Sequence, residues 1–287
     1  MKAGMIARGR DKGAVARFRA AVRVVFSSWT ATVGFCLIAF WVLGAVFAPV
    51  LAPYDPLEQD IHAINTGPSA AHPLGTDDLG RDLLSRLLYG ARPVLLLAPL
   101  SVLLSLMAGA AMGLASGYYG GWTDEVVMRV VDAMMAFPPI LIYLVIIAAV
   151  GPSATNVVLA IVLAGAPGIA KLVRSLTLDV RTREYVAAAK LRGESPLYIM
   201  VAEILLNTMG PVLVDAMLRV GYAVIAIGTL GFLGLGLPPP YPDWGSMVAR
   251  ARRQIWLNPW AVLWPTLSIS TFVVGLNLLV DGIREKA

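Results

Sequence analysis

The sequence contains few charged residues and almost no cysteine. Only 14% of its 287 residues are charged, whereas soluble domains carry about 25%. Cys36 is the single cysteine, so a disulfide within the chain and a metal site built from several cysteines are both excluded. A chain with so little charge is typical of an integral membrane protein.

The sequence also lacks the residues that most enzymes need. No stretch matches the G-x-x-x-x-G-K-[ST] loop that binds nucleotide phosphates, and there is no plausible set of nucleophile, base and orienting residue. The two histidines, His62 and His72, fall in one polar segment. We therefore expect no catalytic residue, metal or cofactor in this chain. The net charge of +5 does not indicate a nucleic-acid partner, because the basic residues cluster beside apolar runs.

Long apolar runs make up most of what is present. Apolar residues are 58% of the chain, and the mean hydropathy is +0.74. About 20 apolar residues cross a bilayer as a helix, so the runs predict an all-α integral membrane protein with six transmembrane helices. These spans are expected at about 30–51, 93–117, 126–150, 154–170, 209–235 and 260–280.

Prolines and glycines add detail to the expected spans. Pro138-Pro139 should kink the third span, and the fourth should be broken near Pro167-Gly168. The second span repeats glycine at every fourth position, a spacing that lets two helices pack closely in lipid. These glycines are Gly109, Gly113 and Gly117.

The distribution of positive charge predicts how the chain is divided. Cytoplasmic segments carry an excess of lysine and arginine, which places residues 1–29 and 171–207 in the cytoplasm and makes the first span an uncleaved one. The expected divisions are a basic cytoplasmic N-terminus (1–29), a first span with an extracytoplasmic segment (30–92), a five-helix transmembrane domain (93–280) that contains a polar loop (181–207), and a cytoplasmic tail (281–287).

The extracytoplasmic segment should contain a helix. Thr76 can cap a helix whose first turn holds Asp77 and Asp78. Leucines between positions 79 and 88 then form one apolar face. This pattern predicts a helix along the membrane surface, with its carboxylates, including Asp82, toward water.

The stretch 184–211 is the longest polar, charged segment in the second half of the chain. Ala187 to Ala189 are strong helix formers with almost no side chain, so a partner's surface can approach the backbone. Gly193 should end this helix, and Ser195 with Pro196 should begin the next. A helix–turn–helix between two spans lies in water, where another protein can bind it.

These residues resemble a known motif. Ala187-Ala188-Ala189 followed by Gly193 is similar to the "EAA, three residues, G" loop of ABC-importer permeases. In that family the loop forms short coupling helices that dock into a cytoplasmic ATPase subunit. The motif's glutamate position is Ala187 here, and Glu184 lies one turn earlier.

Three further stretches resemble one branch of that family. Residues 74–92 are similar to the LGTD-LGRD-LSR-YGAR signature of dipeptide, oligopeptide and nickel permeases. Residues 230–236 resemble the LSFLGLG segment of these permeases, and residues 242–247 their P-x-WG-x-M segment. The motifs lie within about 74–260, so the resemblance covers the transmembrane domain.

The resemblance implies a type I ABC importer permease fold in a bacterial inner membrane, with both termini cytoplasmic. The chain would be the second, C-type permease of a binding-protein-dependent importer and would form half of the pathway for di- or oligopeptides. Implied partners are a homologous permease, two cytoplasmic ATPases that bind ATP and magnesium, and an extracytoplasmic binding protein. Implied ATPase-coupling residues are Glu184, Ala187, Ala188, Ala189, Gly193, Glu194 and Ser195.

Two alternatives stay open. Nickel or another small solute can be the cargo of the same architecture. A self-sufficient secondary transporter would need no ATPase, but such proteins usually show an internal repeat and several ionisable groups within the membrane. The sequence shows no convincing repeat and few charges at that depth.

Asp215 and Arg219 are the charges that stand out within a span. They lie one turn apart in the fifth span. A charge that faces lipid costs at least about 2.5–3.5 kcal/mol, so both should face protein or an aqueous pathway. The spacing favours a structural ion pair at the interface between two permease subunits. The alternative is that one of them lines the pathway and contacts the cargo.

Overall fold

The computed structural model describes residues 28–285. The basic N-terminal segment expected at 1–29 therefore lies almost entirely outside the described residues, and so do the last two residues of the expected tail. In the described part the chain is helical, and its only bridge between extended residues is an isolated one that joins Thr76 and Asp82. The expected all-α fold is confirmed.

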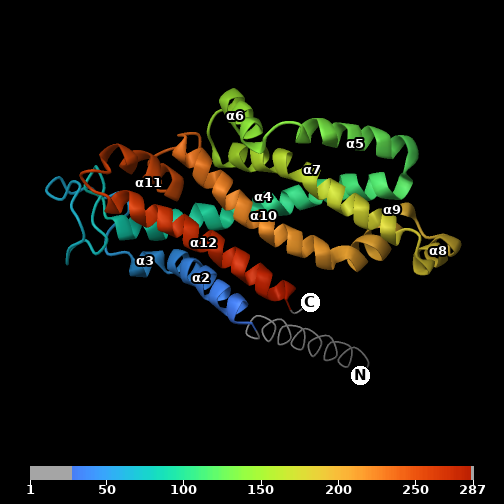
Figure 1. Ribbon diagram of the computed structural model, residues 1–287. Coiled ribbons are helices and arrows are strands. Elements are labelled where there is room, and N and C mark those ends of the chain that lie inside the picture. Colours follow the sequence, from blue (N-terminus) through green and yellow to red (C-terminus); the bar gives the residue numbers. More distant parts are fainter. Residues whose placement is uncertain (1–27, 286–287) are drawn as a thin grey trace, which may run out of the picture.

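The long helices run lengthwise through an elongated bundle, and the short α6 stands across it (Figure 1). In chain order they are α2 (Trp29–Val46), α3 (Ala48–Leu51), α4 (Leu83–Tyr119), α5 (Gly121–Met135), α6 (Pro139–Val150), α7 (Ala154–Val180), α8 (Glu184–Leu191), α9 (Pro196–Tyr198), the π-helical segment η1 (Ile199–Leu205), α10 (Leu206–Phe232), α11 (Trp244–Ala251), the short η2 (Arg252–Gln254) and α12 (Trp260–Arg284). The segment 52–82 and α11 lie at one end of the bundle, and α8 lies at the other (Figure 1).

Six membrane spans follow when α5 and α6 count as one bent span. The other five are long and apolar enough to cross a bilayer, and one of them, Pro196–Phe232, consists of α9, η1 and α10 in continuous succession. The axes of α5 and α6 differ by 86° across the break at Pro138-Pro139, which confirms the predicted kink. The predicted break at Pro167-Gly168 is wrong, because α7 continues through it.

The glycine repeat of α4 packs directly against α7, as predicted. A methyl group placed on Gly113 would lie 2.5 Å from the carbonyl oxygen of Ala170. One placed on Gly109 would lie 2.6 Å from the carbonyl oxygen of Ala166. Contacts this close are possible only without a side chain, so the glycines set the distance between the two helices.

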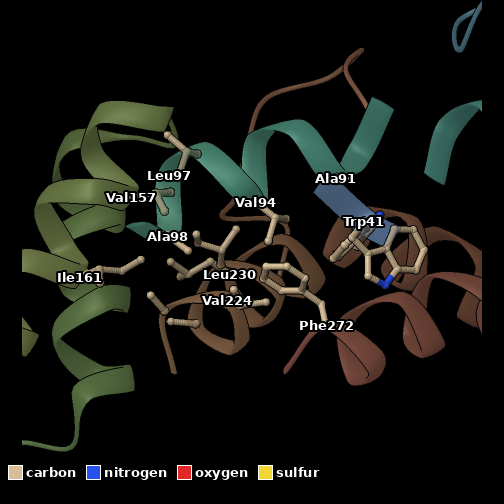
Figure 2. Packing of buried hydrophobic residues seen from close by; sticks show 14 of the residues in the cluster. Trp41, Ala91, Val94, Leu97, Ala98, Val157, Ile161, Val224, Leu230 and Phe272 are labelled. Carbon is tan, nitrogen blue, oxygen red and sulfur yellow. The ribbon is translucent and has the colours of Figure 1, made fainter. Parts of the chain in front are cut away.

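A cluster of aromatic and aliphatic side chains fills the end of the bundle near α11 (Figure 2). Trp244 is fully buried, and its ring centroid lies 4.9 Å from that of Trp41 and 6.4 Å from that of Phe272. Its indole Nε1 donates a hydrogen bond to the carbonyl oxygen of Leu87 at 3.0 Å. One side chain therefore joins α11 to α2, α4 and α12.

The start of α4 differs from the prediction. The helix begins at Leu83 rather than after Thr76, and the carboxylate of Asp82 caps it by accepting from the Ser85 N–H at 2.7 Å. It continues without interruption to Tyr119, across the boundary expected between residues 92 and 93. Leu83 and its neighbours Leu87 and Leu88 are buried in the protein, so the expected surface helix with a leucine face on the membrane is wrong.

The carboxylates expected to face water are largely buried in a polar cluster instead. Asp77 accepts from Arg81 Nε at 2.7 Å and lies 3.4 Å from Arg86 Nε. Asp82 lies 3.1 Å from His72 Nδ1. Buried charges are tolerated when they are paired and hydrogen-bonded, and each of these two carboxylates has a charged or imidazole partner within ten residues.

Two of the family-like stretches pack against each other near this cluster. Asp243 caps α11 by accepting from the Ser246 N–H at 3.0 Å, and burial raises the pKa of its carboxyl. A methyl group on Gly231, in the stretch 230–236, would lie 2.4 Å from Asp243 Oδ1. The side chain of Asn258, which precedes α12, donates to the Thr76 carbonyl oxygen at 2.7 Å. The conformation of these stretches thus depends on long-range contacts.

A glycine-to-alanine pair tests the contact between α4 and α7. Gly113→Ala overpacks this contact, a change that costs about 1–3 kcal/mol, so the thermal unfolding midpoint of the purified, detergent-solubilised protein should fall. Gly210→Ala is the matched control, because Gly210 lies in α10 with open space around it. Alanine favours a helix over glycine, so the control should leave the midpoint unchanged or raise it. Equal midpoints for the two variants would contradict this account of the packing.

Candidate functional site

The polar loop 181–207 lies at the end of the bundle opposite to α11 (Figure 1). It begins after α7 and contains α8, a turn, α9 and η1 before α10 resumes the span. From here on it is called the coupling loop. The helix–turn–helix predicted from the sequence is present, with an additional π-helical turn that the sequence analysis missed.

Gly193 ends α8 in the conformation that the sequence predicts. Its φ is +77°, in the left-handed region that glycine favours. The Gly193 N–H donates to the Lys190 carbonyl oxygen at 3.0 Å, and the Glu194 N–H donates to that of Ala189 at 3.2 Å. This pair of hydrogen bonds is a Schellman motif, so the end of the helix and the direction of the following chain are fixed locally.

Ser195 and Pro196 begin the next helix as predicted. The Ser195 hydroxyl accepts from the Tyr198 N–H at 3.3 Å, and Pro196 occupies the first turn of α9. The chain then widens into η1 from Ile199 to Leu205. Single π-helical turns occur frequently at functional sites, but no residue pattern in this stretch distinguishes one from an α-helix.

The predicted coupling residues divide between two faces of the loop. Glu184, Ala187, Ala188, Gly193 and Ser195 are exposed, and Glu194 is half-buried. Ala189 is fully buried. The expectation that all three alanines leave the backbone open to a partner is therefore wrong at Ala189, which faces the protein.

The buried face of the coupling loop continues the core between α4 and α7. Val186 and Ala189 from α8 share one hydrophobic cluster with Ile199 and Ile204 from η1. The same cluster includes Ala110, Leu114, Ile169, Val173 and Val212 from the spans. A displacement of the loop must therefore be transmitted to the ends of the spans, because close-packed side chains move together.

The tip of the coupling loop exposes apolar side chains. Leu191 is 90% exposed and Leu197 is 68% exposed. Tyr198 is also exposed. We name Leu191, Leu197 and Tyr198 the loop tip. Exposed apolar groups of this kind mark binding surfaces for other proteins.

Asp215 and Arg219 form the ion pair predicted from their spacing. Arg219 Nε lies 2.5 Å from Asp215 Oδ2 within α10. Neither side chain is fully buried, with exposed fractions of 25% for Arg219 and 30% for Asp215. Arg219 also points across to α7, where its Nη1 lies 3.4 Å from the Gly165 carbonyl oxygen. Both charges are thus neutralised within one chain.

Arg219 lines a cavity of about 190 Å³. Polar side chains from three other positions, Ser105, Tyr143 and Tyr222, line it as well. No sequence pattern links these three residues, because they belong to α4, α6 and α10 and only the fold brings them together. Within residues 28–285, no group of three or more His, Cys, Asp or Glu side chains could hold a metal ion.

The sequence matches two known families. Residues 105–286 match the family described as the binding-protein-dependent transport system inner membrane component. Residues 17–68 match the N-terminal transmembrane domain of oligopeptide transport permease C. The first match alone covers more than half of the chain.

Relatives align with nearly the whole chain. The dipeptide transport system permease protein DppC of Alkalihalophilus pseudofirmus is 40% identical over 95% of this chain and 90% of its own length. The di/tripeptide transport system permease protein DppC of Pseudomonas aeruginosa is 41% identical over 88% and 85%. The glutathione transport system permease protein GsiD of Pectobacterium atrosepticum is 39% identical over 86% and 81%.

A solved structure shares the fold. A chain of the MetNI methionine ABC transporter, determined in inward-facing conformations, has a TM-score of 0.55 and covers 70% of this chain and 96% of its own. Its sequence identity is 19%, so the likeness shows the fold alone, which is the expected ABC importer permease fold. Together with the family match and the relatives, it shows that this multi-pass membrane protein belongs to the family of inner membrane components of binding-protein-dependent transport systems.

Proposed function

We propose that the protein is the C-type permease subunit of an ATP-driven importer and forms half of a pathway for peptides. The observation that carries the proposal is the coupling loop, which is exposed at its tip and continuous with the core of the spans at its base. Relatives at about 40% identity are named as permeases of dipeptide and di/tripeptide transport systems.

The loop tip is the surface we assign to a cytoplasmic ATPase. Leu191 and Leu197 supply apolar contact, while Arg192 stands between Glu194 and Glu203 at 3.6 Å and 3.4 Å and ties the turn to η1. Hydrolysis of ATP, with its magnesium, belongs to two such partner subunits, since the sequence has no phosphate-binding loop of its own.

We assign the remaining partners from the family to which the chain belongs. A homologous permease would complete the pathway, and an extracytoplasmic binding protein would deliver cargo to the end that carries α11. The lysines and arginines of the coupling loop support a cytoplasmic location for it. With six spans this puts both termini in the cytoplasm of a bacterial cell, in the inner membrane.

Uptake by the complete importer tests the proposed function. The complex of this chain with its partner permease, ATPases and binding protein, reconstituted in proteoliposomes, should accumulate radiolabelled Ala-Ala when ATP is present. Uptake of radiolabelled nickel ions instead of Ala-Ala would favour the alternative cargo. Accumulation without ATPase subunits would indicate a self-sufficient secondary transporter and overturn the proposal.

Substitutions at Gly193 test the coupling loop. A side chain at positive φ costs about 1–2 kcal/mol, and a β-branched one fits this conformation worst, so Gly193→Val should release the turn and abolish uptake. Gly193→Asn is the matched control, because asparagine tolerates the left-handed conformation. The space around Gly193 is open, so the control should import normally. Both variants should reach the membrane in normal amounts, and wild-type uptake by Gly193→Val would contradict the assignment.

Labelling of single cysteines tests the orientation. In a Cys36→Ala background, Glu58→Cys and Ala188→Cys place one thiol at each end of the bundle, and both native side chains are exposed. An impermeant thiol reagent added to intact cells should label position 58 at once and position 188 only after the membrane is broken. The reverse order would show that the orientation is wrong.

A further inference from the structure

The cavity beside Arg219 lies where four helices meet, next to the bend between α5 and α6. Val102 and Ser105 contribute from α4, Pro139 and Tyr143 from the start of α6, and Gly165 from α7, while Arg219 and Tyr222 contribute from α10. The volume of about 190 Å³ is smaller than the 300–1,000 Å³ of a typical small-molecule pocket. A cavity of this size holds an end group of a larger molecule.

Two of the hydrogen-bond donors that line this cavity have no partner within residues 28–285. Among the described residues, neither the Tyr143 hydroxyl nor the Tyr222 hydroxyl forms a hydrogen bond, whereas Ser105 donates to the Ser101 carbonyl oxygen at 2.8 Å. Tyr143 is half-buried, whereas Tyr222 is exposed, and a tyrosine hydroxyl that is buried usually has a partner. Two hydroxyls that line one cavity therefore offer a binding site for an acceptor.

Asp215 occupies only one edge of the Arg219 guanidinium. The Nε atom lies 2.5 Å from Asp215 Oδ2, and Nη1 makes a long contact of 3.4 Å with the Gly165 carbonyl oxygen. Nη2 has no acceptor within residues 28–285. The two Nη atoms form the fork that binds a carboxylate through two parallel hydrogen bonds.

The face of α10 that carries these groups is unsuited to lipid. Asp215, Arg219, Tyr222 and Thr229 follow one another at spacings of whole helical turns, and Tyr222 is 71% exposed. Arg219 lies midway along the helix, where a charge in lipid is most expensive. The face must therefore border protein or water, and a cavity that opens onto it can be reached by a polar molecule.

We propose that this cavity binds the terminal carboxylate of a peptide during its passage, with Arg219 as the cation and the hydroxyls of Tyr143 and Tyr222 as donors. The inference rests on the proposed function, since every unmodified peptide ends in a carboxylate. The site fits this group in charge, in the kind of donors it offers and in size, and it leaves the peptide's side chains outside the cavity, where their variety has no effect on binding.

Asp215 is a positioning residue in this site. Its carboxylate accepts from Nε, which leaves the Nη atoms for other acceptors, and its negative charge weakens the attraction between Arg219 and an arriving carboxylate. A transport site must bind its cargo weakly enough to release it. The ion pair predicted from the sequence therefore has a role within this chain, because Asp215 moderates the charge of Arg219. No charge from a second subunit is needed to explain the pair.

The test compares two cargos in the reconstituted complex, Ala-Ala and its C-terminal amide, at equal occupancy of the binding protein. A hydrogen bond to a charged group changes an equilibrium constant by at least about tenfold. The wild-type complex should therefore import Ala-Ala about tenfold faster than the amide. Arg219→Gln should slow Ala-Ala to the rate of the amide. Tyr143→Phe and Tyr222→Phe should each slow Ala-Ala about three- to tenfold, and Tyr119→Phe, an exposed hydroxyl at the far end of α4, should have no effect.

The outcomes separate the site from the proposed function. If the wild-type complex imports neither peptide nor amide, the proposed function fails and the inference falls with it. The second outcome is that the wild type imports Ala-Ala and that Tyr143→Phe, Tyr222→Phe and Arg219→Gln all import it as fast as the wild type. In that case only the carboxylate site is overturned. If Arg219→Gln fails to co-purify with its partners while both tyrosine variants transport normally, Arg219 is a structural residue and the site is again overturned.

Discussion

The close contact between α4 and α7 is the constraint on which the rest of the protein depends. Gly109, Gly113 and Gly117 let the two backbones approach until a single methyl group would collide. At one end of this pair the coupling loop packs into the same cluster of side chains. In the middle of the pair the cavity beside Arg219 opens between them and α10. A rigid pair of helices can therefore connect events at the loop with events at the cavity.

Charged side chains that the protein removes from water are paired with a charged or imidazole partner. At the outer end, Asp77 and Asp82 are buried but paired with Arg81 and His72. In the middle of α10, Arg219 is balanced by a neighbour one turn away. Isolated charges of this kind would each cost several kcal/mol, so pairing is required everywhere except at the water-exposed coupling loop. Arg219 lines a cavity together with the hydroxyls of Tyr143 and Tyr222, and we therefore assign cargo contact to this residue.

Local sequence rules succeeded where the backbone itself decides the structure. Gly193 and Ser195 mark a helix end and a helix start through hydrogen bonds to residues within a few positions, so the sequence predicts them. The same rules failed at Thr76, a good N-cap candidate. There the competing cap Asp82 is supported by His72, and the Thr76 carbonyl oxygen accepts from Asn258, far along the chain. No local pattern reveals such contacts.

The sequence by itself determined the membrane class, the six spans, the helix–turn–helix of the coupling loop and the ion pair in α10, because hydrophobic length and helical spacing are local properties. Tertiary structure alone decided that Ala189 faces the core, that Leu197 is exposed and that α7 continues through Pro167. It also brought Tyr143 and Tyr222 to the same cavity as Arg219. The reason is physical: burial and cavity lining depend on which helices pack together, and that packing involves residues widely separated in the sequence.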